Sequence, residues 1–140
     1  MNNVYFKAIH QIILTGHWIT DSIGKELKEF GISEPQYNVL RILRGAKGKP
    51  ITVQEIQENM VQRSSNVTRI IDKLLTKKLV ERKECPTNRR KMDITITAGG
   101  MKSLEEFDQK VKAFHQPMME NLNDKELETL KQLITKLKGE

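Results

Sequence analysis

Apolar residues recur every three or four positions along most of the chain, which is the spacing of amphipathic helices. The longest such stretch runs from Val4 to Phe30 and stops at Gly31, a residue type that commonly ends helices. Shorter helices are predicted over 32–44, in two segments between 53 and 79, from Ala98 to about Glu120, and from Asn123 towards the C-terminus. Pro117 should kink or end the helix that begins at Ala98.

Helix starts are marked by polar residues that can satisfy unpaired backbone N–H groups. Three of them show the spacing of a capping box, in which two side chains three residues apart each accept a bond from the other's backbone. These pairs are Ser33 with Gln36, Thr52 with Glu55, and Asn123 with Glu126. Thr97 is a further candidate cap. The helix boundaries are therefore predicted independently of the apolar spacing.

Two short strands are predicted, at 79–84 and 91–97, and the second shows the alternation of apolar and polar residues that is typical of a strand. In the second strand, Met92, Ile94 and Ile96 should face inward. The intervening segment Cys85–Arg90 has the composition of a turn and carries two arginines near its tip. The expected fold is therefore mainly α with a small β-hairpin wing, a winged helix-turn-helix flanked by N- and C-terminal helices.

The second of the two short helices has one apolar and one polar face. Its apolar stripe consists of Val67, Ile70, Ile71, Leu74 and Leu75. The opposite face has short hydrogen-bonding residues near its start and cations further along, a distribution suited to a helix in a DNA major groove. A merely solvated face has the same composition, so this helix alone leaves both interpretations open.

The charge distribution favours the DNA interpretation. Between Arg63 and Lys91 there are ten lysines and arginines and three acidic residues, so this segment carries +7 while the rest of the 140-residue chain carries −1 of the total +6. A basic protein without such a surface would spread its charge, whereas a phosphate-binding surface concentrates it. A winged helix that binds an acidic protein partner is the alternative.

Several motifs resemble those of the MarR family of bacterial transcription regulators. They are Ser65-Asn66-Val67-Thr68-Arg69, Ile71-Asp72-Lys73-Leu74, Lys78-Leu79-Val80-Glu81-Arg82, Pro86, Asn88-Arg89-Arg90, Ile94, Thr97 and Gly100. The resemblance covers nearly the whole chain. It implies a homodimer that binds pseudopalindromic double-stranded DNA, usually represses transcription and is often released by a small-molecule effector.

The resemblance also implies a division of the chain within a single domain, 1–140. Residues 32–97 would form the DNA-binding lobe, and residues 1–30 and 98–140 the helical dimerisation region. Three positions depart from the family pattern: Cys85 and Asn88 stand where aspartates are usual, and Lys78 stands where Gly is usual. The resemblance implies that the aspartate nearer the tip holds a wing arginine by an ion pair. Because Asn88 is neutral and can offer only a hydrogen bond, we expect a looser wing here.

The candidate DNA-binding residues fall into two groups. On and before the second short helix, the expected recognition helix, we expect base or phosphate contacts from Arg63, Ser64, Ser65, Asn66, Thr68, Arg69 and Lys73, with one of the serines as an alternative helix cap. In the wing we expect minor-groove or backbone contacts from Arg89, Arg90 and Lys91. The alternative for the wing is that its cations only increase solubility.

A ligand pocket is a further expectation, since family members often respond to effectors. Its candidate lining is Gly16, His17, Trp18 and Tyr37. Gly16 lies on the apolar stripe of the first helix, where a small residue indicates either close helix packing or a gap; we expect close packing. Cys85 is either an oxidant sensor or an inert cysteine.

Other classes of function find little support in the residues. No apolar run approaches the roughly 20 residues of a membrane span, and the N-terminus lacks the pattern of a secretion signal. The three histidines and the single cysteine give no metal-ligand spacing, and no nucleophile–base pair or cofactor motif is present. We therefore expect a cytoplasmic protein that is not an enzyme and has no cofactor or metal.

Overall fold

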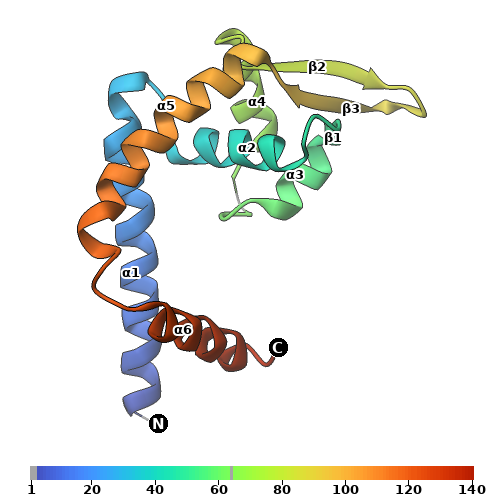
Figure 1. Ribbon diagram of the computed structural model, residues 1–140. Coiled ribbons are helices and arrows are strands. Elements are labelled where there is room, and N and C mark those ends of the chain that lie inside the picture. Colours follow the sequence, from blue (N-terminus) through green and yellow to red (C-terminus); the bar gives the residue numbers. More distant parts are fainter. Residues whose placement is uncertain (1–2, 64) are drawn as a thin grey trace.

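The computed structural model describes residues 3–63 and 65–140 and shows a mainly helical chain with a small antiparallel sheet (Figure 1). The elements in chain order are α1 (Asn3–Leu27), α2 (Glu34–Gly45), β1 (Ile51–Thr52), α3 (Val53–Asn59), α4 (Val67–Thr76), β2 (Val80–Cys85), β3 (Asn88–Ile96), α5 (Ala98–His115) and α6 (Asp124–Leu137). Short 3-10 turns, Lys28–Phe30 and Gln116–Met118, follow α1 and α5. The predicted fold class is confirmed.

The predicted helix starts are largely confirmed. Both side-chain bonds of the capping box form at Ser33 and at Asn123, and Thr97 accepts from the backbone of Gly100 at 2.9 Å. At Thr52 the box is only half formed, because Glu55 accepts a bond from the Thr52 hydroxyl instead of its backbone N–H.

Helix ends also follow the sequence. After α1, Gly31 adopts a φ of 69°, a left-handed conformation that favours glycine. The helix α5 ends at His115, two residues before Pro117, whose ring cannot continue a helix.

The sheet has one more strand than the sequence predicted. β3 lies in the middle, with β2 on one side and the two-residue β1 on the other, where Ile51 pairs with Ile94. Such a short strand has no recognisable alternation of its own. The inward orientation of Met92 was wrong, since this side chain is 37% exposed, whereas Ile94 is fully buried.

The hydrophobic core lies mostly within residues 32–97 and under α5. Leu40, Ile56, Leu74, Ile94 and Leu104 have essentially no exposed surface. In contrast, α6 contributes no buried residue, and α1 contributes only Leu27 at its end. Figure 1 shows α1 as a long spine, with the lobe beside its C-terminal half and α6 beside its N-terminal half. Within one chain, α1 and α6 therefore bury almost none of their apolar side chains.

Candidate nucleic-acid interface

The turn between α3 and α4 is fixed by amide side chains from two helices. Gln57 of α3 donates to the backbone carbonyl oxygens of Ser65, at 3.0 Å, and of Arg63. Asn38 of α2 accepts from the backbone N–H of Val61 at 2.8 Å. The predicted residues Arg63 and Ser65 thus lie on a braced segment, and Arg63 is exposed. Sequence reasoning missed both amides because such bonds join residues of different elements.

The recognition helix α4 is capped by Asn66 and not by a serine. Its Oδ1 atom accepts from the backbone N–H of Arg69 at 3.2 Å, so the Asn66 amide nitrogen is the part of this side chain that can reach a base edge. The alternative that a serine caps the helix is wrong for Ser65; Ser64 lies outside the described residues.

The two faces of α4 separate as predicted. Val67, Ile71 and Leu74 are buried, and Ile70 and Leu75 pack partly against the core. Thr68, Arg69 and Lys73 are exposed on the other side. The helix therefore presents hydrogen-bonding and cationic groups to solvent while its apolar stripe anchors it, the arrangement that a DNA-reading helix needs.

The three wing cations lie in an irregular part of the hairpin. Glu84 pairs with Met92, but the next residue of β2, Cys85, pairs with Asn88. Residues 89–91 consequently have no counterparts in β2 and form a bulge, a device that redirects side chains away from the ladder. All three are exposed, and the turn itself is Pro86–Thr87, so the cations begin β3 and do not form its tip.

Asn88 holds the main chain of the wing. Its Oδ1 atom accepts from the backbone N–H of Arg90 at 3.0 Å, which stabilises the start of the bulge without engaging the guanidinium group. The side chains of Arg89 and Arg90 are exposed to solvent, where a ligand could reach them. Asn88, being uncharged, does not form the ion pair with a wing arginine that an aspartate would form in the family.

One groove joins the recognition helix to the wing. It has a volume of about 500 Å³ and is lined by Thr68 of α4, Arg82 of β2, and Arg90 and Lys91 of β3. Its remaining lining comes from β1, α3 and β3: Thr52, Val53, Gln54, Gln57 and Met92. Amides, hydroxyls and cations around one concave surface match the chemistry of a phosphate backbone and its neighbouring bases.

An ion pair ties the two sides of this groove together. Arg82 Nη1 of β2 lies 3.0 Å from Asp72 Oδ1 of α4, and both side chains are partly exposed. The sequence motif contains both residues but does not reveal the contact, because they lie on different elements. This exposed pair links β2, the first strand of the wing, to the recognition helix.

The residues of the predicted ligand pocket lie in different surroundings. Gly16, His17 and Trp18 are exposed on α1, and the Trp18 ring meets that of Phe114 of α5 at 5.6 Å. Tyr37 is buried between α2 and α5, so the pocket stays a prediction. The expected close packing at Gly16 has no partner within one chain, because a methyl group at this position would have no described atom outside its own helix backbone within 4 Å.

Cys85 is partly exposed, with its Sγ atom 3.3 Å from the Thr87 hydroxyl. This contact distinguishes neither the sensor nor the inert interpretation. Over residues 3–63 and 65–140, histidine, cysteine and carboxylate side chains nowhere gather in threes as a metal site requires. Within the same residues, no helix has the length and apolar character to cross a membrane.

The fold and its basic groove define a winged helix-turn-helix protein. The model of the MarR family matches residues 32–92. The chain is 30% identical to the multiple antibiotic resistance protein MarR of Escherichia coli (strain K12) over 116 residues, which are 82% of this chain and 79% of that protein. The chain therefore belongs to the MarR family of transcriptional regulators.

Two further comparisons extend over nearly the full length. The HTH-type transcriptional regulator YwoH of Bacillus subtilis (strain 168), itself uncharacterised, is 28% identical over 133 residues, 95% of each chain. The crystal structure of a cysteine-to-serine mutant of E. coli MarR in complex with operator DNA superimposes with a TM-score of 0.80 at 28% identity and covers 96% of both chains. The flanking helices are thus shared with the family as well as the lobe.

Proposed function

We propose that this protein is a homodimeric transcription regulator, a repressor, which binds a pseudopalindromic operator. The observation that carries the proposal is the groove in which Thr68 of the recognition helix meets Arg90 and Lys91 of the wing. The resemblance to an E. coli MarR structure that contains operator DNA supports the same conclusion.

The recognition helix α4 would enter the major groove and the bulged wing the adjacent minor groove. Base and phosphate contacts are assigned to Arg63, Ser64, Ser65, Asn66, Thr68, Arg69 and Lys73, and minor-groove contacts to Arg89, Arg90 and Lys91. Arg82 is added to this set, because it lines the shared groove while pairing with Asp72. Exposure of the cations and the bracing of the turn by Gln57 support these roles.

The terminal helices would pair with those of a second copy. Leu130, Leu133 and Leu137 of α6 and Ile12 of α1 line an almost entirely apolar groove of about 620 Å³, yet these side chains are about half exposed. A second chain would remove this surface from water. Residues 32–97 then form the DNA-binding lobe and residues 1–30 and 98–140 the dimerisation region of one domain. The two recognition helices would lie about one DNA turn, ~34 Å, apart.

Regulation by a small effector is part of the proposal. A ligand bound near Gly16, His17, Trp18 and Tyr37 would change the spacing of the two recognition helices and release DNA. We also propose a cytoplasmic location, which a DNA partner and a single cysteine support, since one cysteine cannot form an internal disulfide. A DNA-binding regulator of this kind would need neither catalysis nor a cofactor.

Selection from a pool of random duplexes at two salt concentrations tests the function directly. We expect enrichment of an inverted repeat whose half-sites are about one turn apart. Salt-sensitive binding without a preferred sequence would instead define a basic DNA-coating protein. Absence of binding to any duplex would contradict the proposal and favour the interaction with an acidic protein partner.

A further inference from the structure

The carboxylate of Asp108 joins α5 to α2 of the DNA-binding lobe. Asp108 of α5 accepts a hydrogen bond from the Tyr37 hydroxyl through Oδ1, at 2.6 Å, and pairs with the Arg44 guanidinium through Oδ2. Both partners lie on α2. The two carboxylate oxygens of Asp108 therefore bind two different residues of α2.

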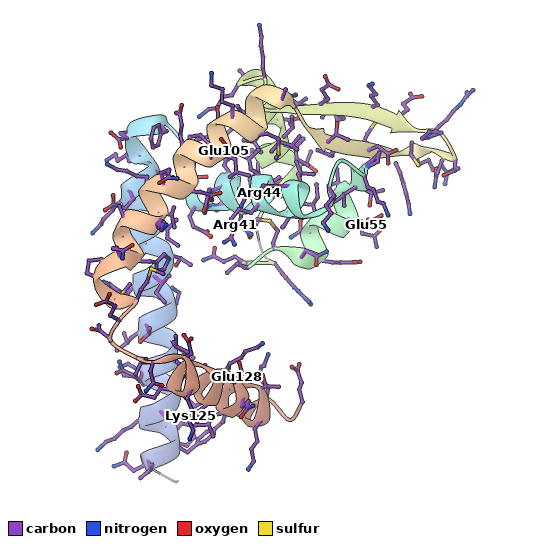
Figure 2. The ribbon with its side chains drawn as sticks, viewed as in Figure 1. Arg41, Arg44, Glu55, Glu105, Lys125 and Glu128 are labelled. Atoms are coloured by element: carbon purple, nitrogen blue, oxygen red, sulfur yellow. The ribbon has the colours of Figure 1, made fainter. Side chains whose placement is uncertain are left out.

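The spacing of the two partners makes this contact restrictive. Tyr37 and Arg44 are seven positions apart, which is about two turns or ~10 Å along a helix. Because Asp108 holds both, sliding or rotation of α2 along α5 would break at least one bond. Arg41 lies on the same face of α2, over the Tyr37 ring at 5.7 Å, and Figure 2 shows Arg41 and Arg44 on α2 below α5.

The environment strengthens the contact. Tyr37 is 4% exposed, and the side chains of Arg44 and Asp108 are 33% and 32% exposed. Burial, together with the hydrogen bond to Asp108, raises the pKa of Tyr37 above its ordinary value of 10.0, so this hydroxyl stays a donor into the alkaline range. Partly buried, charge-assisted bonds are stronger than the surface ion pairs found elsewhere on such helices.

From α2 the restraint reaches the DNA-reading surface through physical contacts. Asn38, next to Tyr37, accepts from the backbone of Val61 at the start of the turn before α4. Val39, Leu40 and Leu43 of α2 are buried in the lobe core. Any movement of α2 relative to α5 would therefore carry the turn and the recognition helix with it.

We propose that Asp108 is a positioning residue, which fixes the angle of the DNA-binding lobe on α5 and thereby the half-site spacing that the dimer accepts. This inference rests on the proposed function, since it concerns two recognition helices on one operator. Asp108 contacts no DNA in this assignment; it acts through Tyr37 and Arg44.

The variant Asp108→Asn tests the role with little change in size. Its amide oxygen can still accept from Tyr37, but the charge that pairs with Arg44 is lost. The matched control is Lys110→Gln on the same helix, which removes an ion pair of 2.9 Å between Lys110 and Glu29 and leaves α2 untouched. Affinity is measured for the selected operator and for versions with one or two base pairs inserted between the half-sites.

We expect wild-type protein and Lys110→Gln to bind the selected spacing preferentially. In Asp108→Asn that preference should fall roughly fivefold or more, the lower range of typical coupling between sites. Affinity for an isolated half-site should stay unchanged. An unchanged spacing preference in Asp108→Asn would overturn the inference while leaving the proposed function intact.

A distance measurement gives a second readout that needs no DNA. Cys85 is the only cysteine in the sequence and lies in the wing, so a spin label on it reports the distance between the two wings of a dimer. We expect a broader distance distribution in Asp108→Asn than in wild type or Lys110→Gln, and an equal width would contradict the positioning role. Should Asp108→Asn fail to fold, Arg44→Gln removes the same ion pair and is measured in the same way.

The two readouts separate failure of the inference from failure of the function. If wild-type protein selects no inverted repeat, the proposed function is wrong, whereas the width of the distance distribution still decides whether Asp108 positions the lobe. If the labelled wild type gives no wing-to-wing distance, the dimer itself is wrong, and the positioning role falls with it.

Discussion

At the scale of single residues, Lys78 departs from the family pattern at a backbone position with a specific requirement. It follows α4 with a φ of 61°, in the left-handed region that glycine adopts readily and other residues rarely. The family resemblance implies glycine at this position, and the structure supplies the physical reason. The chain therefore retains conformational strain immediately after its recognition helix.

Replacing Lys78 by Gly should stabilise the protein. The left-handed conformation costs an L-residue about 1–2 kcal/mol, and the greater freedom of glycine in the unfolded chain offsets about 0.5–1 kcal/mol of the gain. We expect the free energy of unfolding in urea to rise by about 0.5–1 kcal/mol. The control Lys73→Gly, in the last turn of α4, should lower the free energy of unfolding by up to about 1 kcal/mol, and equal effects of both variants would contradict the explanation.

Gly100, in the first turn of α5, is required by a close approach of the backbone. A Cβ atom at this position would lie 2.1 Å from the carbonyl oxygen of Leu79 and 2.8 Å from a carbon of Ile96. Thr97 reinforces the same junction, because its hydroxyl donates to the carbonyl of Lys78 at 2.9 Å while accepting from Gly100. The start of α5 is thus packed directly against the end of the hairpin.

The substitution Gly100→Ala should destabilise the protein by about 1–3 kcal/mol, the usual cost of overpacking a site whose neighbours cannot move. Gly99→Ala is the matched control, since the nearest neighbour of its new methyl group, Thr97 Oγ1, would be 3.8 Å away. Thermal unfolding of the two variants provides the comparison. A neutral Gly100→Ala would show that the junction is not tightly packed.

At the scale of elements, the contact between α2 and α5 combines an ion pair with a buried tyrosine. Burial is the larger cause of the raised Tyr37 pKa, and the hydrogen bond to Asp108 adds to it, because an ionised tyrosine beside a carboxylate would be repelled. In the unfolded chain, tyrosine loses its proton near its ordinary pKa of 10.0. The folded state then holds one proton that the unfolded state has lost.

This difference gives a prediction for alkaline pH. Where the folded state binds more protons, stability falls as pH rises, so the contribution of Tyr37 is complete below pH 10 and declines above it. Tyr37→Phe should lose about 1.5 kcal/mol at pH 7, the cost of a hydrogen bond to a charged group. The difference in the free energy of unfolding between wild type and Tyr37→Phe is measured by urea unfolding from about pH 8 to about pH 11.5, and it should become smaller above pH 10. A difference that does not change with pH would contradict this assignment.

At the scale of the whole molecule, the core and the apolar surface lie in different places. The lobe and α5 bury their large side chains, whereas α6 leaves Leu133 58% exposed and its neighbours in the apolar groove nearly as open. The charged residues Lys125 and Glu128 of α6, labelled in Figure 2, are exposed. The pattern is that of a helix with one apolar face that a partner helix can cover.

Leu133→Asp should convert the dimer to a monomer, because a charge would be placed in the apolar groove between α1 and α6. Sedimentation should show the change, and operator affinity should fall at least roughly tenfold as two linked half-site contacts become one. The control Gln132→Asp, one position away and outside the groove lining, should remain dimeric. A dimeric Leu133→Asp protein would place the interface elsewhere.

The sequence by itself determined the helices, most of their caps and the location of the positive charge, since these depend on neighbours within a few residues. The tertiary structure alone decided features that join distant residues: β1 beside β3, Arg82 with Asp72, Gln57 beneath the turn, and Asp108 with Tyr37 and Arg44. No periodicity encodes such pairs, because each partner's position is set by how the helices pack. The bulge at residues 89–91 belongs to the second group, since it depends on the register between two strands.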